Sequence, residues 1–195
     1  MLRVMIVDDS GIEAHRRSLY LRLMLEQVGY TVVAEVFEPR RIYDAVRTRE
    51  PDVIIIDTES PSRDTLEHIA LISEKDPRPI VMFSSDRGSD AIREAVQAGV
   101  SAYIVDGLAA ERVKPIVEVA IARFESYQAV RAELAQVKSK LSERKVVERA
   151  KGALMKARSI GEEEAYAALR RMAMERNLTI GEVSRQFLAV SDLLG

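Results

Sequence analysis

The sequence contains no cysteine and no tryptophan, and it has only two histidines among its 195 residues. Without cysteine, the chain has no disulfides, no thiolate metal sites and no cysteine nucleophile. The two histidines, His15 and His68, are too few and too far apart to indicate a metal centre. Long apolar runs are also missing: the longest run of large aliphatic residues is 53–56, whereas a membrane-spanning helix needs about 20 residues. Because the N-terminus lacks a signal-peptide pattern as well, we expect a soluble cytoplasmic protein with no membrane contact.

Glycine and proline are absent from residues 116–151, where Ala, Glu, Lys, Arg, Leu and Val are common. These residues lose little on entering a helix, and Pro115 is placed as a first-turn proline. At about 1.5 Å per residue, the segment predicts a helix of about 54 Å, too long for the interior of one small domain. Four of its apolar residues are spaced by 4, 3 and 4 positions, as in a short coiled coil: Val130, Leu134, Val137 and Leu141. We therefore predict a connector that forms a homodimer.

The net charge of −2 is unevenly distributed. Residues 1–137 carry 17 Lys and Arg against 23 Asp and Glu, a balance of −6, whereas residues 138–195 carry 12 against 8, a balance of +4. A basic unit beside an acidic one suggests a nucleic-acid contact at the C-terminal end only. A helical domain can also carry this charge without binding anything.

Strand and helix patterns alternate over the first 122 residues. Five apolar stretches are typical of strands: 3–7, 31–37, 53–56, 80–83 and 102–105. Amphipathic stretches separate them, so the pattern predicts a parallel sheet with helices on both faces. In such sheets, sites form beyond the carboxyl ends of the strands.

Acidic residues stand where two of these strands end. Asp8 and Asp9 follow the first strand, Asp57 follows the third, and Ser84 closes the fourth. Carboxylates gathered at one sheet edge repel each other unless a cation compensates, and hard oxygen ligands suit Mg²⁺. With the metal present, one carboxylate can attack a phosphoryl group, and the Ser84 hydroxyl can bond a phosphoryl oxygen and move its loop. The alternative is that these acids only cap helices or stay solvated.

The same residues resemble a response-regulator receiver domain. The resemblance rests on Asp8-Asp9, on Asp57 with Pro61 four residues later, on residues 79–84, and on Gly99-Val-Ser-Ala-Tyr103. It implies a five-stranded doubly wound fold with Asp57 at the phospho-acceptor position. It also implies a Mg²⁺ site formed by Asp9, Asp57 and the Glu59 carbonyl with Asp8 close by, and switch positions at Ser84 and Tyr103.

One position departs from the receiver pattern. Receivers normally have Lys and then Pro three residues after the tyrosine, and this sequence has Asp106 and Gly107 there. The missing lysine would have bonded the acceptor carboxylate or a phosphoryl oxygen, and an aspartate adds like charge to an anionic pocket. We therefore expect weak or absent phosphorylation at Asp57 and a receiver controlled mainly by a protein partner.

Three helical stretches fit residues 142–195. The first continues the long helix, and the other two open with capping-box patterns, Ser159-x-x-Glu162 and Thr179-x-x-Glu182. Their apolar faces would close a small three-helix unit, and we expect Tyr166 and Phe187 in its core.

This tail resembles the ANTAR domain, a family of RNA-binding modules in transcription antiterminators that are often joined to receivers through a coiled coil. The resemblance rests on residues 144–155, 163–166 and 169–173, and most of all on Ala150-Lys151-Gly152 with Leu154. Residues 57–64 and 78–83 are similar in particular to nitrate-assimilation antiterminators, which a nitrate-sensing partner holds in check. RNA contacts are expected at Arg144, Lys145, Arg149, Lys151, Gly152, Arg170 and Arg171. Packing against a neighbouring helix is an equal explanation for Gly152.

The sequence therefore predicts an α/β doubly wound receiver at 1–122, a coiled-coil dimerisation linker at 123–141 and an all-α three-helix ANTAR domain at 142–195. As a dimer it would bind hairpins in leader mRNA, under the control of an inhibitory nitrate-sensor protein or, alternatively, a histidine kinase.

Two other interpretations are a DNA-binding or phosphorelay response regulator activated at Asp57, and a module that binds only proteins. Arg185 is the only basic residue at 180–193, which argues against a DNA-recognition helix. An enzyme is not expected, because no phosphate-binding glycine loop or nucleophile–histidine pair is present.

Overall fold

The computed structural model describes residues 1–9, 14–105 and 109–194. The chain forms two compact units, residues 1–128 and 129–195. None of the helices in the described ranges is long and apolar enough to cross a membrane.

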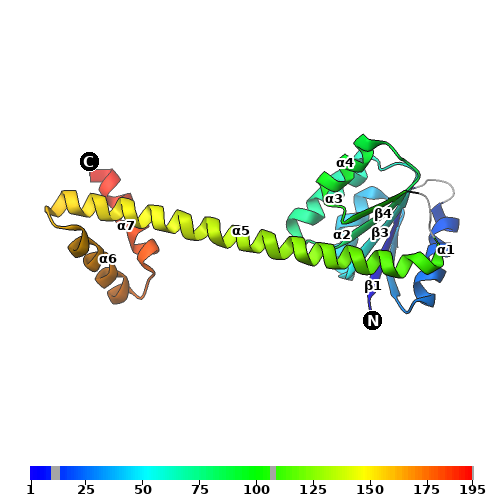
Figure 1. The fold of residues 1–195 in the computed structure, drawn as a ribbon, viewed down its shortest axis with the longest axis horizontal. Coiled ribbons are helices and arrows are strands. Elements are labelled where there is room, and N and C mark those ends of the chain that lie inside the picture. The colour runs from blue at the N-terminus through cyan, green and yellow to red at the C-terminus, as the bar shows by residue number, and fades with distance from the viewer. Residues whose placement is uncertain (10–13, 106–108, 195) are drawn as a thin grey trace. The chain divides into compact units, whose positions relative to one another are not determined.

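The first unit is built on a five-stranded parallel sheet (Figure 1). Its strands are β1 (Arg3–Asp8), β2 (Thr31–Val36), β3 (Val53–Thr58), β4 (Ile80–Ser84) and β5 (Ala102–Val105). They lie in the order β2-β1-β3-β4-β5, so the chain winds outward in both directions from β1. The predicted doubly wound receiver fold is confirmed.

Helices cover both faces of the sheet, which explains why its central strands are apolar along their whole length. The helices are α1 (Ala14–Gln27), α2 (Ile42–Arg49) after the short 3-10 turn η2 (Pro39–Arg41), α3 (Arg63–Lys75), α4 (Ser89–Ala98) and the first part of α5 (Ala110–Arg158). Successive residues of β3 point to opposite faces. Ile54 and Ile56 pack with α2, α3 and α4, whereas Val53 and Ile55 pack with α1 and α5.

The second unit consists of three helices, as predicted. The C-terminal part of α5 packs with α6 (Glu162–Arg176) and α7 (Ile180–Leu194). Leu154 of α5, Leu169 of α6 and Val183 of α7 meet in one buried core.

Only one of the two predicted capping boxes forms. At the start of α7, the Glu182 N–H donates to Thr179 Oγ1 at 3.2 Å, and the Thr179 N–H donates to Glu182 Oε2 at 2.8 Å. The prediction for Ser159 is wrong, because α6 begins at Glu162 and its N-cap is Gly161. Ser159 instead follows the last residue of α5 with a φ of 54°, a left-handed conformation typical of a residue that ends a helix.

Helix α5 has 49 residues and extends beyond the glycine- and proline-free segment 116–151 at both ends. It begins at Ala110, so Pro115 lies inside the helix rather than in its first turn. The ring of Pro115 has no N–H to donate to the preceding turn, and the apolar residues Val113 and Val117 on either side are fully buried against the sheet. Tertiary packing therefore outweighs the local preference of proline for a helix start.

Gly99 ends α4 in a conformation that other residues adopt with strain. Its φ is +117°, and a Cβ added there would collide with the Ser73 side chain. Gly29 also has a positive φ, +87°, but a Cβ there would meet nothing within 4 Å.

We expect Gly29→Ala to lower the free energy of unfolding by about 1 kcal/mol and Gly99→Ala to lower it by about 2 to 3 kcal/mol, because the second also adds a steric clash. Urea unfolding of both variants measures the difference, and equal losses would contradict a role for Ser73.

Candidate functional site

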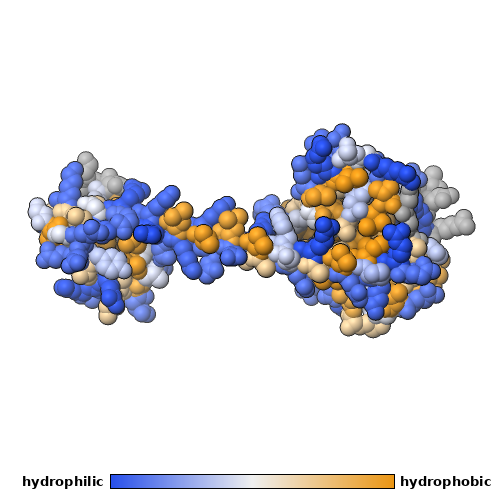
Figure 2. Space-filling model, in the orientation of Figure 1, coloured by the Kyte–Doolittle hydropathy of each residue, from blue (hydrophilic) through white to orange (hydrophobic). Residues whose placement is uncertain are grey.

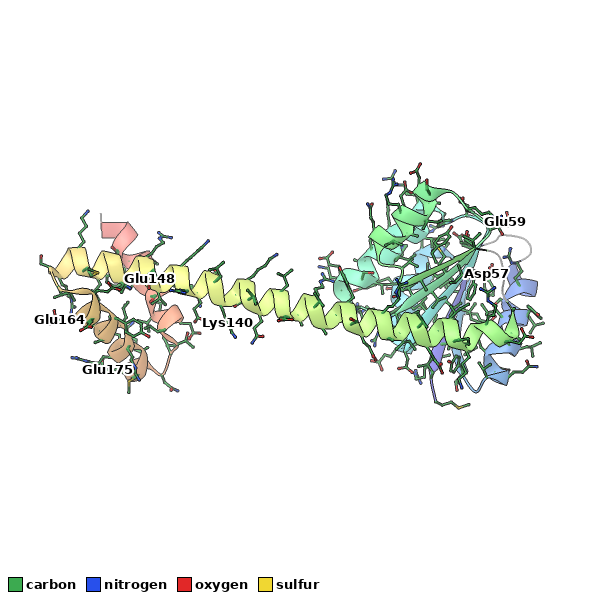
Figure 3. All side chains as sticks on the ribbon, viewed as in Figure 1. Asp57, Glu59, Lys140, Glu148, Glu164 and Glu175 are labelled. Atoms are coloured by element: carbon green, nitrogen blue, oxygen red, sulfur yellow. The ribbon has the colours of Figure 1, made fainter. Side chains whose placement is uncertain are left out.

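The acidic residues predicted at the strand ends do lie together. Asp8 of β1 stands opposite Asp57 of β3 in the sheet register, and their exposed fractions are 1% and 2%. The backbone N–H of Asp9 donates to the Asp57 carbonyl at 3.2 Å. Figure 3 shows Asp57 and Glu59 at the same end of the sheet. We name this site, formed by Asp8, Asp9, Asp57 and the Glu59 carbonyl, the acid pocket.

The acid pocket also contains an arginine that the sequence did not indicate. Arg17 of α1 donates from Nε to Asp57 Oδ2 at 3.0 Å and from Nη2 to Asp57 Oδ1 at 2.9 Å. The guanidinium therefore engages both carboxylate oxygens at once, the geometry of the strongest arginine–carboxylate pairs. Arg17 and Asp57 are 40 positions apart in the sequence, so no local sequence motif indicates this contact.

Burial is the main influence on the charge of Asp57. It raises the pKa of the Asp57 carboxyl above its ordinary value, and the Asp8 carboxylate raises it further. The guanidinium of Arg17 opposes both effects because it stabilises the ionised form. The charge of Asp57 in the acid pocket thus depends on the cation beside it.

Asp9 is tied to a different helix. The Thr65 hydroxyl donates to Asp9 Oδ2 at 2.7 Å, and Thr65 lies in the first turn of α3, where Ser62 is the N-cap. The loop after β1 is thereby attached to the helix after β3. The carboxylates of Asp9 and Asp57 have separate hydrogen-bond partners.

The two predicted switch residues meet at one loop. The Ser84 hydroxyl donates to the Glu59 carbonyl at 3.0 Å and accepts from the Asp86 N–H at 3.1 Å. The Tyr103 hydroxyl donates to the Asp86 carbonyl at 3.0 Å. Asp86 therefore joins Ser84 and Tyr103, so a shift of this loop would affect both. The third predicted switch position, Asp106, lies outside the described residues.

The oxygen atoms at the acid pocket match the chemistry of Mg²⁺. Asp8, Asp9, Asp57 and the Glu59 carbonyl offer the hard oxygen ligands that this ion prefers, and the buried carboxylates call for a positive charge. Within residues 1–9, 14–105 and 109–194, however, no three acidic, histidine or cysteine side chains are gathered closely enough to hold a metal ion. The carboxylate of Asp57 faces Arg17 instead. The residues fit Mg²⁺ by type, and both carboxylate oxygens of Asp57 accept hydrogen bonds from Arg17.

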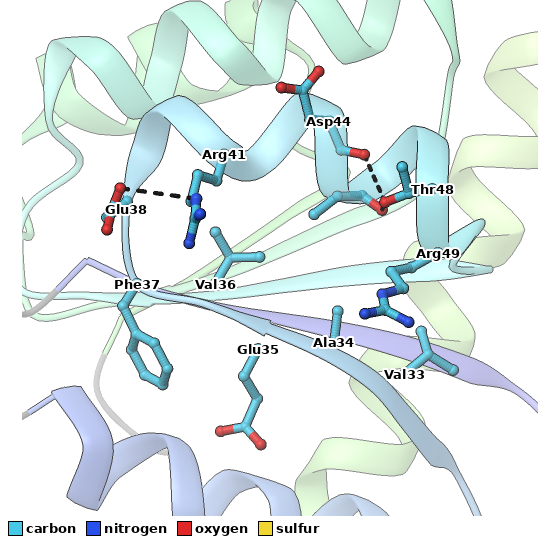
Figure 4. A pocket seen from close by; sticks show the side chains of 11 residues that line it. Val33, Ala34, Glu35, Val36, Phe37, Glu38, Arg41, Asp44, Thr48 and Arg49 are labelled. Carbon is cyan, nitrogen blue, oxygen red and sulfur yellow. Dashed lines mark hydrogen bonds and ion pairs between the residues drawn. The ribbon is translucent and has the colours of Figure 1, made fainter.

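A groove of about 580 Å³ runs along the outer edge of the sheet, between β2 and α2 (Figure 4). Several of its polar side chains bond to neighbours in the same groove. Glu38 pairs with Arg41 at 4.0 Å, and the Thr48 hydroxyl donates to the Asp44 carbonyl at 2.9 Å. Acidic and basic residues are mixed along it. This mixture favours no particular class of ligand.

Most of the residues predicted to contact RNA are exposed on the second unit: Arg144, Lys145, Arg149, Gly152, Arg170 and Arg171. Gly152 is exposed, and a Cβ added there would meet nothing within 4 Å. Packing against another helix in the described chain therefore does not explain this glycine. Tyr166, expected in the core, is 47% exposed, so that prediction is wrong, whereas Phe187 packs against the core as expected.

Lys151 is placed differently from the other candidates. Its side chain is only 11% exposed, and its Nζ lies 2.6 Å from Glu148 Oε2 and 2.7 Å from Glu162 Oε1. It links α5 to the first turn of α6. Lys151 is therefore not available to RNA in this conformation, because both of its ion pairs would have to open first.

The predicted dimerisation residues form an apolar stripe on α5. Val130, Leu134, Val137 and Leu141 are each between 51% and 61% exposed, and Tyr127 on the same stripe is exposed as well. Figure 2 shows a row of hydrophobic residues along the middle of α5. We name this stripe the seam. Nothing in the described part of the second unit covers it.

The Lys151 ion pairs should make the second unit sensitive to acid. Hydrogen bonds to Glu148 and Glu162 raise the pKa of the Lys151 ammonium, and the bond from Lys151 lowers the pKa of the Glu162 carboxyl. Because the folded pKa of Glu162 lies below its unfolded value, this pair stabilises the fold above the unfolded pKa. That contribution is lost as the pH falls through the folded pKa.

We therefore expect Lys151→Met to lower the melting temperature at pH 7 and to make it depend less on pH between 5 and 3. Thermal unfolding over this range measures both effects. Lys145→Met, at an exposed position on the same helix, is the control. If the two variants respond to acid alike, the link from α5 to α6 contributes little.

Two families match the two parts of the chain: the response regulator receiver domain over residues 4–118 and the ANTAR domain over residues 135–188. The chain is 31% identical to the transcriptional regulatory protein PdtaR of Mycobacterium tuberculosis over 186 residues, which is 95% of this chain and 89% of that protein. A protein-glutamate methylesterase/protein-glutamine glutaminase of Methylobacillus flagellatus is 30% identical over 105 residues, but the match covers only 53% of this chain and 29% of that protein.

Solved structures resemble the receiver part. The signal receiver domain of a modulated diguanylate cyclase from Desulfovibrio desulfuricans has a TM-score of 0.56 and 22% identity, covering 65% of this chain and 99% of that one. This likeness concerns the fold alone. A LuxR-family two-component response regulator from Aurantimonas has a TM-score of 0.52 and 30% identity, covering 62% of this chain and 84% of that one. With the acid pocket in place at the strand ends and a three-helix unit at the C-terminal side, the chain belongs to the response regulators that combine a receiver domain with an ANTAR domain.

Proposed function

We propose that this protein is a transcription antiterminator that binds hairpins in leader mRNA as a dimer, and that a protein partner controls it through the receiver. The observation that carries the proposal is an exposed basic row on α5, within the part of the chain that matches the ANTAR domain. The receiver supplies an input unit, and the second unit supplies the surface for RNA.

In the basic row on α5, Gly152 stands between cationic side chains and leaves a gap. Lys145, Arg149, Gly152 and Lys156 are all exposed and follow one another at spacings of 4, 3 and 4, so they share one face of α5. Cationic side chains on either side can neutralise phosphates, and the missing side chain at Gly152 lets a sugar or base come close to the helix. A glycine in an exposed helix position costs about 1 kcal/mol relative to alanine, and close approach of RNA accounts for that cost.

Helix α6 offers a second set of groups. Tyr166 and Arg170 are four residues apart and both exposed, and Arg171 follows. An exposed aromatic ring can stack on an unpaired base, which is how proteins usually read hairpin loops. The acidic residues Glu163 and Glu164 in the first turn confine the contact on α6 to the later turns. We therefore assign loop recognition to Tyr166 and Arg170 and phosphate contact to the row on α5.

Dimerisation through the seam would present two such surfaces. Apolar side chains that recur every three or four residues on one exposed face are stabilised by a second helix with the same pattern. A second copy of this chain is the partner that matches the seam. Two RNA surfaces on one dimer suit a leader with two hairpins, and holding both would keep that segment out of a terminator stem.

Control of RNA binding involves the acid pocket of the receiver and a protein partner. Arg17 holds the carboxylate at the phospho-acceptor position, so we propose that phosphorylation of Asp57 is weak. The similarity of residues 57–64 and 78–83 to nitrate-assimilation antiterminators supports an inhibitory nitrate- or nitrite-responsive sensor protein as the partner, rather than a histidine kinase.

Crosslinking of the full-length protein in cells, followed by sequencing of the bound nucleic acid, tests the RNA target. We expect leader RNA with two neighbouring hairpins. Recovery of duplex DNA would support the DNA-binding alternative and overturn the proposal. The recovered RNA then serves as the ligand in binding assays at a fixed salt concentration, since salt alone changes such affinities.

In these assays we expect Gly152→Ala to change the stability of the protein and its affinity for RNA in opposite directions. We expect the variant to be more stable by about 1 kcal/mol because alanine favours the helix, yet to bind the RNA about tenfold more weakly because the methyl group blocks close approach. Gly161→Ala, where a Cβ also meets nothing within 4 Å, is the control and should bind normally. Full RNA affinity in Gly152→Ala would remove this face of α5 from the interface.

Leu134→Glu tests the seam. A charge placed in an apolar helix interface destabilises the pairing, so we expect the dissociation constant of the dimer to rise at least about tenfold. Ala135→Glu adds the same charge at the next exposed position, off the seam, and should leave the dimer intact. Analytical ultracentrifugation measures both. Equal behaviour of the two variants would mean that the chain associates through another surface.

A further inference from the structure

Arg17 reaches the acid pocket from an element that is partly open to solvent. Its side chain is 35% exposed, whereas that of Asp57 is 3% exposed. The contact uses two N–H groups and both carboxylate oxygens, at 3.0 and 2.9 Å. Arginine stays protonated at any physiological pH, so this positive charge is permanent.

The position of α1 is fixed by contacts close to Arg17. The Ser18 hydroxyl donates to Glu35 Oε2 at 2.6 Å, and Arg22 Nε lies 3.1 Å from Glu35 Oε1. Both contacts attach α1 to β2, and Leu21 and Leu25 bury the inner face of the helix against the sheet. The guanidinium is therefore held at the acid pocket by the packing of a whole helix.

The two oxygens that Arg17 occupies are the ones a bound cation and an incoming phosphoryl group would need. A divalent cation takes one carboxylate oxygen, and the other oxygen attacks phosphorus. A guanidinium beside the same carboxylate repels a second cation at this distance. The sequence also has Asp106 where receivers normally have a lysine, so this chain draws a positive charge for Asp57 from α1.

We propose that Arg17 is the resident counterion of the acid pocket and competes with divalent cations for Asp57. The position of α1 then decides whether the pocket accepts a cation. A receiver of this kind changes state when something displaces α1 or when Arg17 swings outward. The proposal concerns the receiver alone and stands or falls independently of RNA binding.

Mn²⁺ binding to the full-length protein tests the competition, with the electron paramagnetic resonance signal of free Mn²⁺ as the readout and Mg²⁺ as the competitor. We expect Arg17→Gln to bind Mn²⁺ about tenfold more tightly than the wild type. Arg22→Gln is the matched control, because it removes the same charge from the same helix but contacts Glu35 rather than Asp57. Its affinity should stay within about twofold of the wild type, and adding Asp57→Asn to Arg17→Gln should abolish the gain.

Equal Mn²⁺ affinity in the wild type and Arg17→Gln would overturn the proposal, and so would equal gains in both arginine variants. Should Arg17→Gln fail to fold, the wild type provides a second measurement. The Nε–H resonance of Arg17 in a nitrogen-15 spectrum should shift toward that of a free guanidinium as Mg²⁺ is added, with the same midpoint as metal binding. A resonance that stays unchanged at Mg²⁺ saturation would also contradict the competition.

Discussion

Two carboxylates buried at the ends of neighbouring strands constrain the whole receiver. Asp8 and Asp57 stand side by side in the sheet register and are almost inaccessible to water. A positive charge stabilises such a pair in its ionised form, because each carboxylate has lost its hydration and faces a like charge. Arg17 provides that charge at Asp57, and this requires α1 to lie close to the end of β3. The surrounding contacts, from Thr65 to Asp9 and from Ser84 to Glu59, fix the loops around the same point.

A different constraint acts on helix α5, which has three structural roles. Helix α5 buries apolar residues in the receiver near its start, exposes the seam in its middle, and contributes Ala150 and Leu154 to the core of the second unit. The exposed basic row occupies the remaining face of the last part. One helix thus carries the seam, which we propose as the dimer interface, and part of the core of each unit.

The sequence predicts the sheet well and the acid pocket only in part. Buried parallel strands are apolar along their length, as residues 53–56 show, and acidic residues at strand ends converge because the strands are parallel. The sequence does not reveal the role of Arg17, because its pairing with Asp57 links residues 40 positions apart and no motif surrounds Arg17. The setting of Lys151 is hidden for a related reason: composition reveals its charge, but its ion pair with Glu162 depends on how α6 folds back on α5. Ser159 fits a capping pattern as well as Thr179 does, and only the extent of α5 separates the two.

The contrast between Lys151 and Gly152 explains why charge alone does not locate an RNA surface. The two residues are adjacent in the sequence, yet the lysine is buried in two ion pairs and the glycine is open to solvent. Neighbouring positions on a helix differ by about 100° in direction, so one can stabilise the core while the next faces a ligand. The lysine ties α6 to α5, and the exposed row with its central gap lies on another face of α5. Under the function we propose, Lys151 would support RNA binding by holding α6 against α5, and Arg149 and the backbone at Gly152 would make the direct contacts.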